Sequence, residues 1–319
     1  MELSPQYEDR AIGALIGTAV GDALGAGYEF DNFVDPADID MLPGKLTGRP
    51  AGHWTDDTDM AMAIALAAVE HGTLTTEAAH TRVAENFLSW FASHPPDVGI
   101  QTRAVLSACG EPRAMFEVAS MFQARRPDAA GNGSLMRTAP VALADCDNLT
   151  AVAKSAVAIS ALTHPHRDAQ DACVLWSVAT ALGVTGSPSL RESMTIALSY
   201  LEPGSEARWR SIVAEAEECD LSHLVPNGWV VRALQAAWRA AVEVEHADPT
   251  LAYADGVRFA ISLGDDTDTI AAIAGGLLGA HFGASTIPLS WRTNLAGWPE
   301  GYGNDELSAL AVALVNGAP

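Results

Sequence analysis

Two stretches of this chain carry a small residue, in most cases glycine, at every fourth position. Glycine destabilises a helix interior by about 1 kcal/mol relative to alanine, so a series of four requires a packing reason. Each series makes a smooth ridge that lets a neighbouring backbone approach closely. A transmembrane role for this spacing is excluded because Asp9, Arg10 and Asp22 lie in or beside the first stretch. The small residues are Gly13, Gly17, Gly21 and Gly25 in one stretch and Ala271, Gly275, Gly279 and Gly283 in the other.

Alanine is abundant along the 319 residues and alternating β-branched runs are scarce, which favours helix almost everywhere. No strand, linker, low-complexity tract or short repeat is predicted, so we expect one compact all-α domain over residues 1–319. The longest irregular stretch, residues 30–54, is rich in Asp, Pro and Gly, and a loop of that length is expected to cover a site. Helices are expected at residues 9–27, 57–71, 75–93, 99–109, 134–143, 149–162, 167–184, 189–201, 205–218, 228–245, 249–263, 267–282 and 304–316.

Two acidic clusters begin two of these expected helices and are near copies of each other. Each packs carboxylates and hydroxyls into one turn and then continues as an apolar helix. Like charges at the start of a buried helix are costly unless a positive group neutralises them. Hard divalent cations such as Mg²⁺ and Mn²⁺ bind carboxylate and hydroxyl oxygens and would do so. The clusters are Thr55-Asp56-Asp57-Thr58-Asp59 and Asp265-Asp266-Thr267-Asp268-Thr269.

The alternative interpretation of either cluster is ordinary helix capping, in which Ser, Thr or Asp precedes a first turn rich in acids. A cap needs one acceptor, and each cluster supplies at least four. We therefore predict a split dinuclear metal site that closes when the two ends of the chain meet. Packing of the two glycine ridges on each other would bring Glu29 near both clusters. A separation above about 10 Å between Glu29 and both Asp57 and Asp268 would exclude this, since carboxylate–metal contacts are about 2–2.5 Å.

The net charge of −22 excludes several partners, because it opposes nucleic-acid backbones and anionic membranes. The four cysteines form no CxxC pair and no HExxH motif occurs, which argues against a zinc site or a disulfide framework. Residues 1–10 are polar and acidic, unlike a signal peptide, and no run of 18 uncharged apolar residues exists. We expect a soluble cytoplasmic protein.

Six motifs follow one another in a fixed order: G-D-A-L-G-A-G-Y-E at 21–29, G-H-W-T-D-D-T-D-M at 52–60, P-D-V-G at 96–99, G-N-G-S-L-M-R at 131–137, T-H-P at 163–165 and G-D-D-T-D-T-I-A at 264–271. Together they resemble the ADP-ribosylglycohydrolases, a family that includes dinitrogenase-reductase-activating glycohydrolase and the ADP-ribosyl-acceptor hydrolases. The resemblance extends from about residue 9 to residue 314. The split acidic pair is the most specific part of it.

The resemblance implies an orthogonal multi-helix fold holding two divalent cations, Mg²⁺ or Mn²⁺. It implies a hydrolase that cleaves the ribosyl C1″ bond of an ADP-ribosylated protein or a small ADP-ribose conjugate, with arginine-type linkages favoured. Carried over by position, Thr55, Asp56, Asp57, Asp266, Asp268 and Thr269 are metal ligands, Glu29 and Asp97 are catalytic, and Asn132, Gly133, Ser134 and His164 contact the substrate.

Two acids depart from the family pattern. Asp265 stands where the family usually has Gly, and Asp59 where a small or neutral residue is common. These acids could orient the metal ligands by interacting with them, or could reduce the selectivity of the site for one metal ion. Thr58 and Thr267 are expected to be local caps rather than ligands.

The loop from Gly131 to Ser134 precedes an expected helix and has the flexible backbone and free N–H groups that bind phosphate. The alternative is a turn followed by a Ser N-cap. For His164 the alternative is a cap on the helix that ends near Leu162. Arg137 could reach a phosphate or could be a surface or ion-pair residue.

In the mechanism that we expect, metal ions bind the ribose hydroxyls, orient a water and stabilise an oxocarbenium-like transition state. Either Glu29 or Asp97 serves as general acid or base. Two other functions are compatible with the residues: a dinuclear phosphohydrolase, and a catalytically silent ADP-ribose-binding protein. The acceptor stays open among arginine, serine, a nucleic-acid base and a metabolite.

Overall fold

Helices make up the regular structure of this protein in the computed structural model, which describes residues 4–187 and 189–316. Within those residues extended segments pair only at isolated bridges, and the all-α prediction is confirmed. The α-helices are α1 (Pro5–Gly25), α2 (Asp56–His71), α3 (Glu77–Ala92), α4 (Ile100–Ala108), α5 (Met115–Arg125), α6 (Ala139–Ala144), α7 (Leu149–Ala161), α8 (Arg167–Thr185), α9 (Leu190–Leu198), α10 (Pro203–Glu218), α11 (Val230–Glu243), α12 (Pro249–Ser262), α13 (Thr267–Phe282), α14 (Leu289–Arg292) and α15 (Asn304–Asn316). The 3₁₀ helices are η1 (Pro36–Asp38), η2 (Pro112–Ala114), η3 (Leu135–Arg137), η4 (Leu221–Leu224) and η5 (Ala284–Thr286).

Three differences from the expected helices have local causes. α1 begins earlier than expected because Ser4 caps it, accepting a hydrogen bond from the Tyr7 amide. The segment expected as one helix at 134–143 is split into η3 and α6, since Pro140 lacks an amide hydrogen and is accommodated only in a first turn. α5 was not predicted, although Met115, Val118, Ala119 and Phe122 have the spacing of an amphipathic helix.

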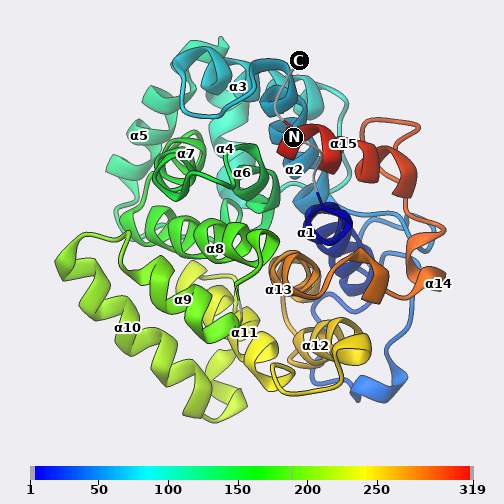
Figure 1. The fold of residues 1–319 in the computed structure, drawn as a ribbon. Helices are drawn as coiled ribbons and strands as arrows, with labels where there is room; N and C mark the ends of the chain where they lie inside the picture. Colours follow the sequence, from blue (N-terminus) through cyan, green and yellow to red (C-terminus); the bar gives the residue numbers. More distant parts are fainter. Residues whose placement is uncertain (1–3, 188, 317–319) are drawn as a thin grey trace.

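α1 and α13 lie side by side in the interior and make the most extensive contact between any two helices (Figure 1). They run antiparallel, with the two small-residue series facing each other, which confirms that the ridges pack together. No side chain larger than hydrogen fits at the glycine positions of α1 that face α13. A Cβ added to Gly13, Gly17 or Gly21 would collide with the carbonyl oxygen of Gly279, Gly275 or Ala271, respectively.

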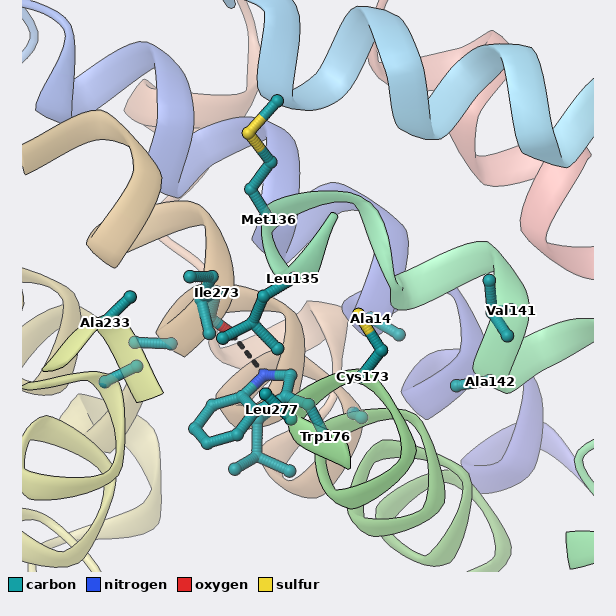
Figure 2. Close-up of a cluster of buried hydrophobic side chains, with 14 of the residues drawn as sticks. Ala14, Leu135, Met136, Val141, Ala142, Cys173, Trp176, Ala233, Ile273 and Leu277 are labelled. Carbon is teal, nitrogen blue, oxygen red and sulfur yellow. Dashed lines mark hydrogen bonds between the residues drawn. The ribbon is translucent and has the colours of Figure 1, made fainter. Parts of the chain in front are cut away.

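The core on one side of this pair centres on Trp176 of α8, whose indole N–H donates a 2.8 Å hydrogen bond to the Ile273 carbonyl of α13 (Figure 2). Ala14 of α1, Leu135 of η3 and Ala233 of α11 belong to the same buried cluster. α1, η3, α8 and α11 therefore pack against α13 and hold it in place. Over the described ranges, no helix combines the length and the apolar character needed to cross a bilayer.

The antiparallel pair also determines which helix ends meet. The C-terminal end of α1 lies against the first turn of α13, where the Thr267 hydroxyl donates a 2.8 Å hydrogen bond to the Gly25 carbonyl. A Cβ on Gly25 would lie 2.5 Å from the Asp268 Cα. Glu29, four residues beyond Gly25, is thereby carried to the acidic start of α13.

Candidate active site

Asp22 of α1 caps the start of α2 from outside that helix. Its Oδ1 accepts hydrogen bonds from the Thr55 amide (2.9 Å) and hydroxyl (2.8 Å), and its Oδ2 accepts from the Thr58 amide (3.0 Å) and hydroxyl (2.6 Å). In a capping box two side chains of the helix itself satisfy these two amides. Here one carboxylate of another helix does both, so the side chains of Asp56 and Asp57 are not needed for capping.

The two acidic clusters and Glu29 come together where α1, α2 and α13 meet. Carboxylate oxygens of Asp22, Asp57 and Asp268 lie within 4.8 Å of one another, and those of Glu29, Asp266 and Asp268 form a second group with the same spacing. The two groups share Asp268. Glu29 is thus far closer to Asp268 than the limit that would have excluded the predicted arrangement, and the two ends of the chain do meet here.

Burial of these acids beside one another raises their carboxyl pKa values. Burial, followed by the charges of neighbouring carboxylates, raises the pKa of Asp56, Asp57 and Asp268 well above the usual range. Burial is also the first cause for Glu29, whose pKa rises to about 8, with the charge of Asp97 the next. Several acids in one buried place are stable together only when protons or cations compensate their charge.

The donor set suits a hard divalent cation. Asp57 Oδ1 is buried and has no hydrogen-bond partner among the described residues, so an oxygen is left to bind a cation. The side chains around it supply carboxylate and hydroxyl oxygens and no sulfur, as Mg²⁺ and Mn²⁺ prefer. Asp22 is less suited to be a ligand, because each of its oxygens already accepts two hydrogen bonds.

Asn227, in the turn before α11, positions the second acidic cluster. Its amide donates to Asp265 Oδ2 at 2.7 Å, and its side-chain oxygen accepts from the Asp266 amide at 3.0 Å. Asp265 has a φ of +66°, a left-handed conformation in which glycine is the least strained residue. Asn132 adds a 2.6 Å hydrogen bond from its amide group to Asp266 Oδ2. The extra acid Asp265 therefore holds the loop from Asn227 rather than completing the carboxylate groups.

Asp59, the other extra acid, is held away from the two carboxylate groups by tryptophans. Its two oxygens accept hydrogen bonds from the indoles of Trp54 (2.8 Å) and Trp90 (2.9 Å), and Oδ1 also accepts from the Trp298 amide at 3.0 Å. Its burial raises its pKa to about 6. Asp59 is thus engaged in anchoring the first turn of α2 to α3 and the C-terminal segment.

The expectation that Thr58 and Thr267 are local caps is wrong. Both hydroxyls donate to α1 instead, Thr58 to Asp22 and Thr267 to the Gly25 carbonyl. They tie the starts of α2 and α13 to the same end of α1, an interaction between segments far apart in sequence.

The carboxylate groups open into a cleft of about 600 Å³. Its acidic end contains Glu29, Asp97 and acids of both clusters. Its walls come from residues 97–102, which lead into α4, and from the loops around residues 129–133 and 226–228. Leu46, from the long 30–54 segment, also reaches it. Of the predicted site residues, those that line the cleft are Glu29, Asp56, Asp57, Asp97, Asn132, Gly133, His164, Asp266, Asp268 and Thr269.

Two predicted site residues do not line the cleft. Thr55 is buried behind it, with its hydroxyl near Asp22 Oδ1 and 3.1 Å from Asp57 Oδ2. Ser134 points into the interior, where its hydroxyl accepts hydrogen bonds from Ser160 (2.9 Å) and Cys173 (3.4 Å). Ser134 does not cap a helix by its side chain, and the element after it is η3.

Several residues that shape the site were missed in the sequence. Asp22 was visible as the one acid in the apolar, glycine-rich part of α1 from Ala11 to Gly25, and that signal could have identified it. Asn227 carried no comparable signal. Phe122 and Arg126 line the cleft from α5 and its end, with the guanidinium carbon 5.6 Å from the Phe122 ring centroid. They were missed because α5 was not predicted.

Comparison with known proteins gives one consistent result. A family model described as ADP-ribosylglycohydrolase matches residues 3–319. The chain is 30% identical to ADP-ribosylarginine hydrolase Tri1 of Pseudomonas putida (strain GB-1), over 99% of this chain and 81% of that protein. It is 29% identical to ADP-ribosyl-[dinitrogen reductase] glycohydrolase of Rhodospirillum rubrum, over 91% of this chain and 92% of that one. A solved structure titled "ADP-ribosylglycohydrolase-related protein complex" superposes with a TM-score of 0.73 at 28% identity, covering 98% of this chain and 99% of its own.

Proposed function

Because the chain belongs to the ADP-ribosylglycohydrolase family and is accordingly a hydrolase of ADP-ribosyl bonds, we propose that it releases ADP-ribose from arginine-linked substrates with the help of two divalent cations. The observation that carries this proposal is the pair of buried carboxylate groups that share Asp268 and open into the cleft.

The proposed ligands are Thr55, Asp56, Asp57, Asp266, Asp268 and Thr269, and the proposed ions are Mg²⁺ or Mn²⁺. When bound, such cations supply Lewis-acid binding of ribose hydroxyls and stabilisation of developing charge. Their double charge also offsets the repulsion among the carboxylates. The unpartnered Asp57 oxygen supports this assignment.

The chain's own residues supply proton transfer and orientation. In the metal-free protein, burial and the neighbouring charge of Asp97 raise the pKa of Glu29 to about 8, and we propose that its carboxyl donates a proton to the leaving group. Asp97 faces the same cleft and can accept a proton from water. The reverse assignment of the two roles uses the same geometry. Asn132, Gly133 and His164 line the cleft beyond the acids and are proposed to bind the rest of the ADP-ribose.

Arginine as the acceptor is supported by the relatives and by charge. One relative's name specifies ADP-ribosylarginine, and the cleft end around Glu29, Asp97 and Asp265 is acidic, which favours a guanidinium leaving group. A protein of net charge −22 also attracts basic segments around a modified arginine.

The test is ADP-ribose release from peptides that carry mono-ADP-ribose on arginine or on serine, with Mg²⁺ or Mn²⁺ and with a chelator. We expect metal-dependent release from the arginine peptide. Release from the serine peptide alone would identify serine rather than arginine as the acceptor. Release that continues in the presence of chelator would contradict the proposed metal site. Phosphate release from a simple phosphoester would favour a phosphohydrolase instead, and ADP-ribose binding without any cleavage would favour a silent binder.

Asp57→Asn and Asp268→Asn should each lower kcat/KM by at least about a thousandfold, about 4 kcal/mol of transition-state stabilisation, while the far-ultraviolet circular dichroism stays unchanged. Mn²⁺ binding, measured by calorimetry, should weaken in both. Normal turnover in both variants would refute the assignment. Unfolding of both would make the cluster structural.

A further inference from the structure

Arg137, in η3, is a buried cation without an acidic partner. It is 1% exposed, and neither expectation for it, a surface position or an ion pair, holds within the described residues. One terminal nitrogen donates to the Thr163 hydroxyl at 2.8 Å and to the Ile159 carbonyl at 3.3 Å, and the guanidinium carbon lies 4.6 Å from the Phe87 ring centroid. Its Nε has no partner among those residues.

Burying an unpaired cation destabilises the folded protein, and an apolar side chain of similar volume would fill the same space without that cost in free energy. Arg137 also does not line the cleft, so it does not contact a substrate there. Its strongest polar contact is with Thr163. Arg137 can therefore act on the cleft through Thr163 and the next group that the Thr163 hydroxyl contacts.

That group is His164, whose Nδ1 lies 2.7 Å from the Thr163 hydroxyl oxygen. Arg137 can only donate, so one lone pair of the hydroxyl oxygen is occupied by its N–H. The buried hydroxyl hydrogen still needs an acceptor, and within the described chain Nδ1 is the one within hydrogen-bond distance. The hydroxyl therefore donates to Nδ1, which leaves the imidazole proton on Nε2.

The Nε2 edge of His164 lies against the glycine loop that borders the cleft, where a Cβ on Gly131 would be 3.7 Å from Nε2. The residue is 2% exposed, it lines the cleft, and no side chain or backbone group of the described residues bonds Nε2. The ring packs against the glycine loop so closely that a Cβ on Gly133 would lie 3.0 Å from its Cε1. Burial, with the charge of Arg137, lowers the pKa of His164 to about 3, which keeps the ring neutral.

We propose that Arg137 is a positioning residue that, through Thr163, holds His164 in the Nε2–H tautomer, so that His164 donates a hydrogen bond to an acceptor atom of the ligand in the cleft. This rests on the proposed function for the identity of the ligand, ADP-ribose. The Nε2–H tautomer requires that the ligand atom next to His164 be a hydrogen-bond acceptor, such as a phosphate oxygen, a hydroxyl oxygen or a ring nitrogen with a free lone pair. An N–H group of the ligand is excluded at this position.

The tautomer can be measured directly in the full-length wild-type protein. Long-range ¹H–¹⁵N NMR distinguishes the two imidazole nitrogens, and a His164→Gln variant identifies the His164 signals among the nine histidines. We expect a protonated Nε2 and an unprotonated Nδ1 at neutral pH. A protonated Nδ1 overturns the proposal without reference to catalysis.

Ligand affinity tests the second half of the proposal. Thr163→Val removes the hydroxyl but keeps the shape, and should weaken ADP-ribose binding by about tenfold, the size of one lost hydrogen bond, with a matching rise in KM and little change in kcat. Thr163→Ser should restore both the tautomer and the affinity. The matched control is Thr18→Val, which removes a buried hydroxyl whose one hydrogen bond within the described residues is to the Ala14 carbonyl of its own helix.

The outcomes separate this inference from the proposed function. If ADP-ribose binds and Thr163→Val weakens it, the inference stands even when no substrate is cleaved. If Thr163→Val changes the tautomer of His164 but leaves the affinity for ADP-ribose unchanged, the proposed hydrogen bond between His164 and the ligand is wrong. Equal losses in Thr163→Val and Thr18→Val would assign the effect to packing and would also overturn it.

Discussion

At the scale of single residues, three aspartates in the first turn of α2 share one chemistry and have different partners. Asp56 and Asp57 face the cleft, and Asp59 points to Trp54 and Trp90. All three lie within one helical turn, where successive residues are about 100° apart around the axis, so Asp59 points about 200° away from Asp57. The sequence shows three equivalent acids, and only the neighbours in space distinguish them.

Asp59→Asn should therefore destabilise the fold and spare the metal site. The new amide would turn a donor toward an indole N–H, leaving buried groups unsatisfied at a cost of about 1–3 kcal/mol. Urea unfolding should show the loss, while calorimetry should show Mn²⁺ affinity within about threefold of wild type, well under 1 kcal/mol. A loss of Mn²⁺ affinity equal to that of Asp57→Asn would show that Asp59 belongs to the metal site.

At the scale of elements, contact between α1 and α13 depends on the absence of side chains. Gly17 and Gly275 oppose each other so closely that each blocks a Cβ on the other. In an isolated helix alanine is favoured over glycine by about 1 kcal/mol. Here the collision should outweigh that gain, because two backbones cannot separate without moving Glu29 and Asp268 apart.

Gly17→Ala should lower the free energy of unfolding by about 1–3 kcal/mol or more and should weaken Mn²⁺ binding as well. Gly204→Ala is the control, since Gly204 lies in α10 with nothing within 4 Å of an added Cβ and should gain up to about 1 kcal/mol. Denaturant unfolding and metal titration check both. A Gly17→Ala protein as stable as wild type would mean that the ridges do not need to touch.

The helices were the most predictable elements, because their spacing of apolar residues is local. α2, α7, α8, α12, α13 and α15 lie close to their expected ranges. α5 was missed although its apolar residues have helical spacing. Only Met115 and Ala119 of α5 are fully buried, and its packing depends on α4 and α7. Because α5 was not predicted, Phe122 and Arg126 were not recognised as residues of the cleft.

At the scale of the whole molecule, the acids brought together at the site give the metal-free protein an unusual dependence on pH. Burial raises the pKa of Glu29 to about 8 and that of Asp22 to about 7, above the values of the unfolded chain. Between the unfolded and folded values the folded protein binds more protons, so the free energy of unfolding decreases as the pH rises.

With a chelator present, stability should fall as the pH rises from about 6.5 to about 8, a window in which His164, with its pKa of about 3, does not titrate. With Mn²⁺ the trend should weaken or reverse, because protons compete with the cation for the same oxygens. Urea midpoints across that range, with and without Mn²⁺, check the prediction. Greater stability at pH 8 in chelator would show that these carboxyls are ionised at little cost.

The sequence by itself determined the helical class, the two glycine series and the two acidic clusters, because each of these is a pattern of residues near one another in the chain. It also predicted the candidate ligands, because they lie in the first turns of two helices, but only packing brings those two turns together. The tertiary structure alone decided that Asp22 caps α2 across 33 residues, that Asn132 reaches Asp266 across 134, and that Ser134 and Arg137 are turned inward. Such contacts depend on the packing of segments that are remote in the chain, and local spacing carries no information about which remote side chain will satisfy a buried polar group.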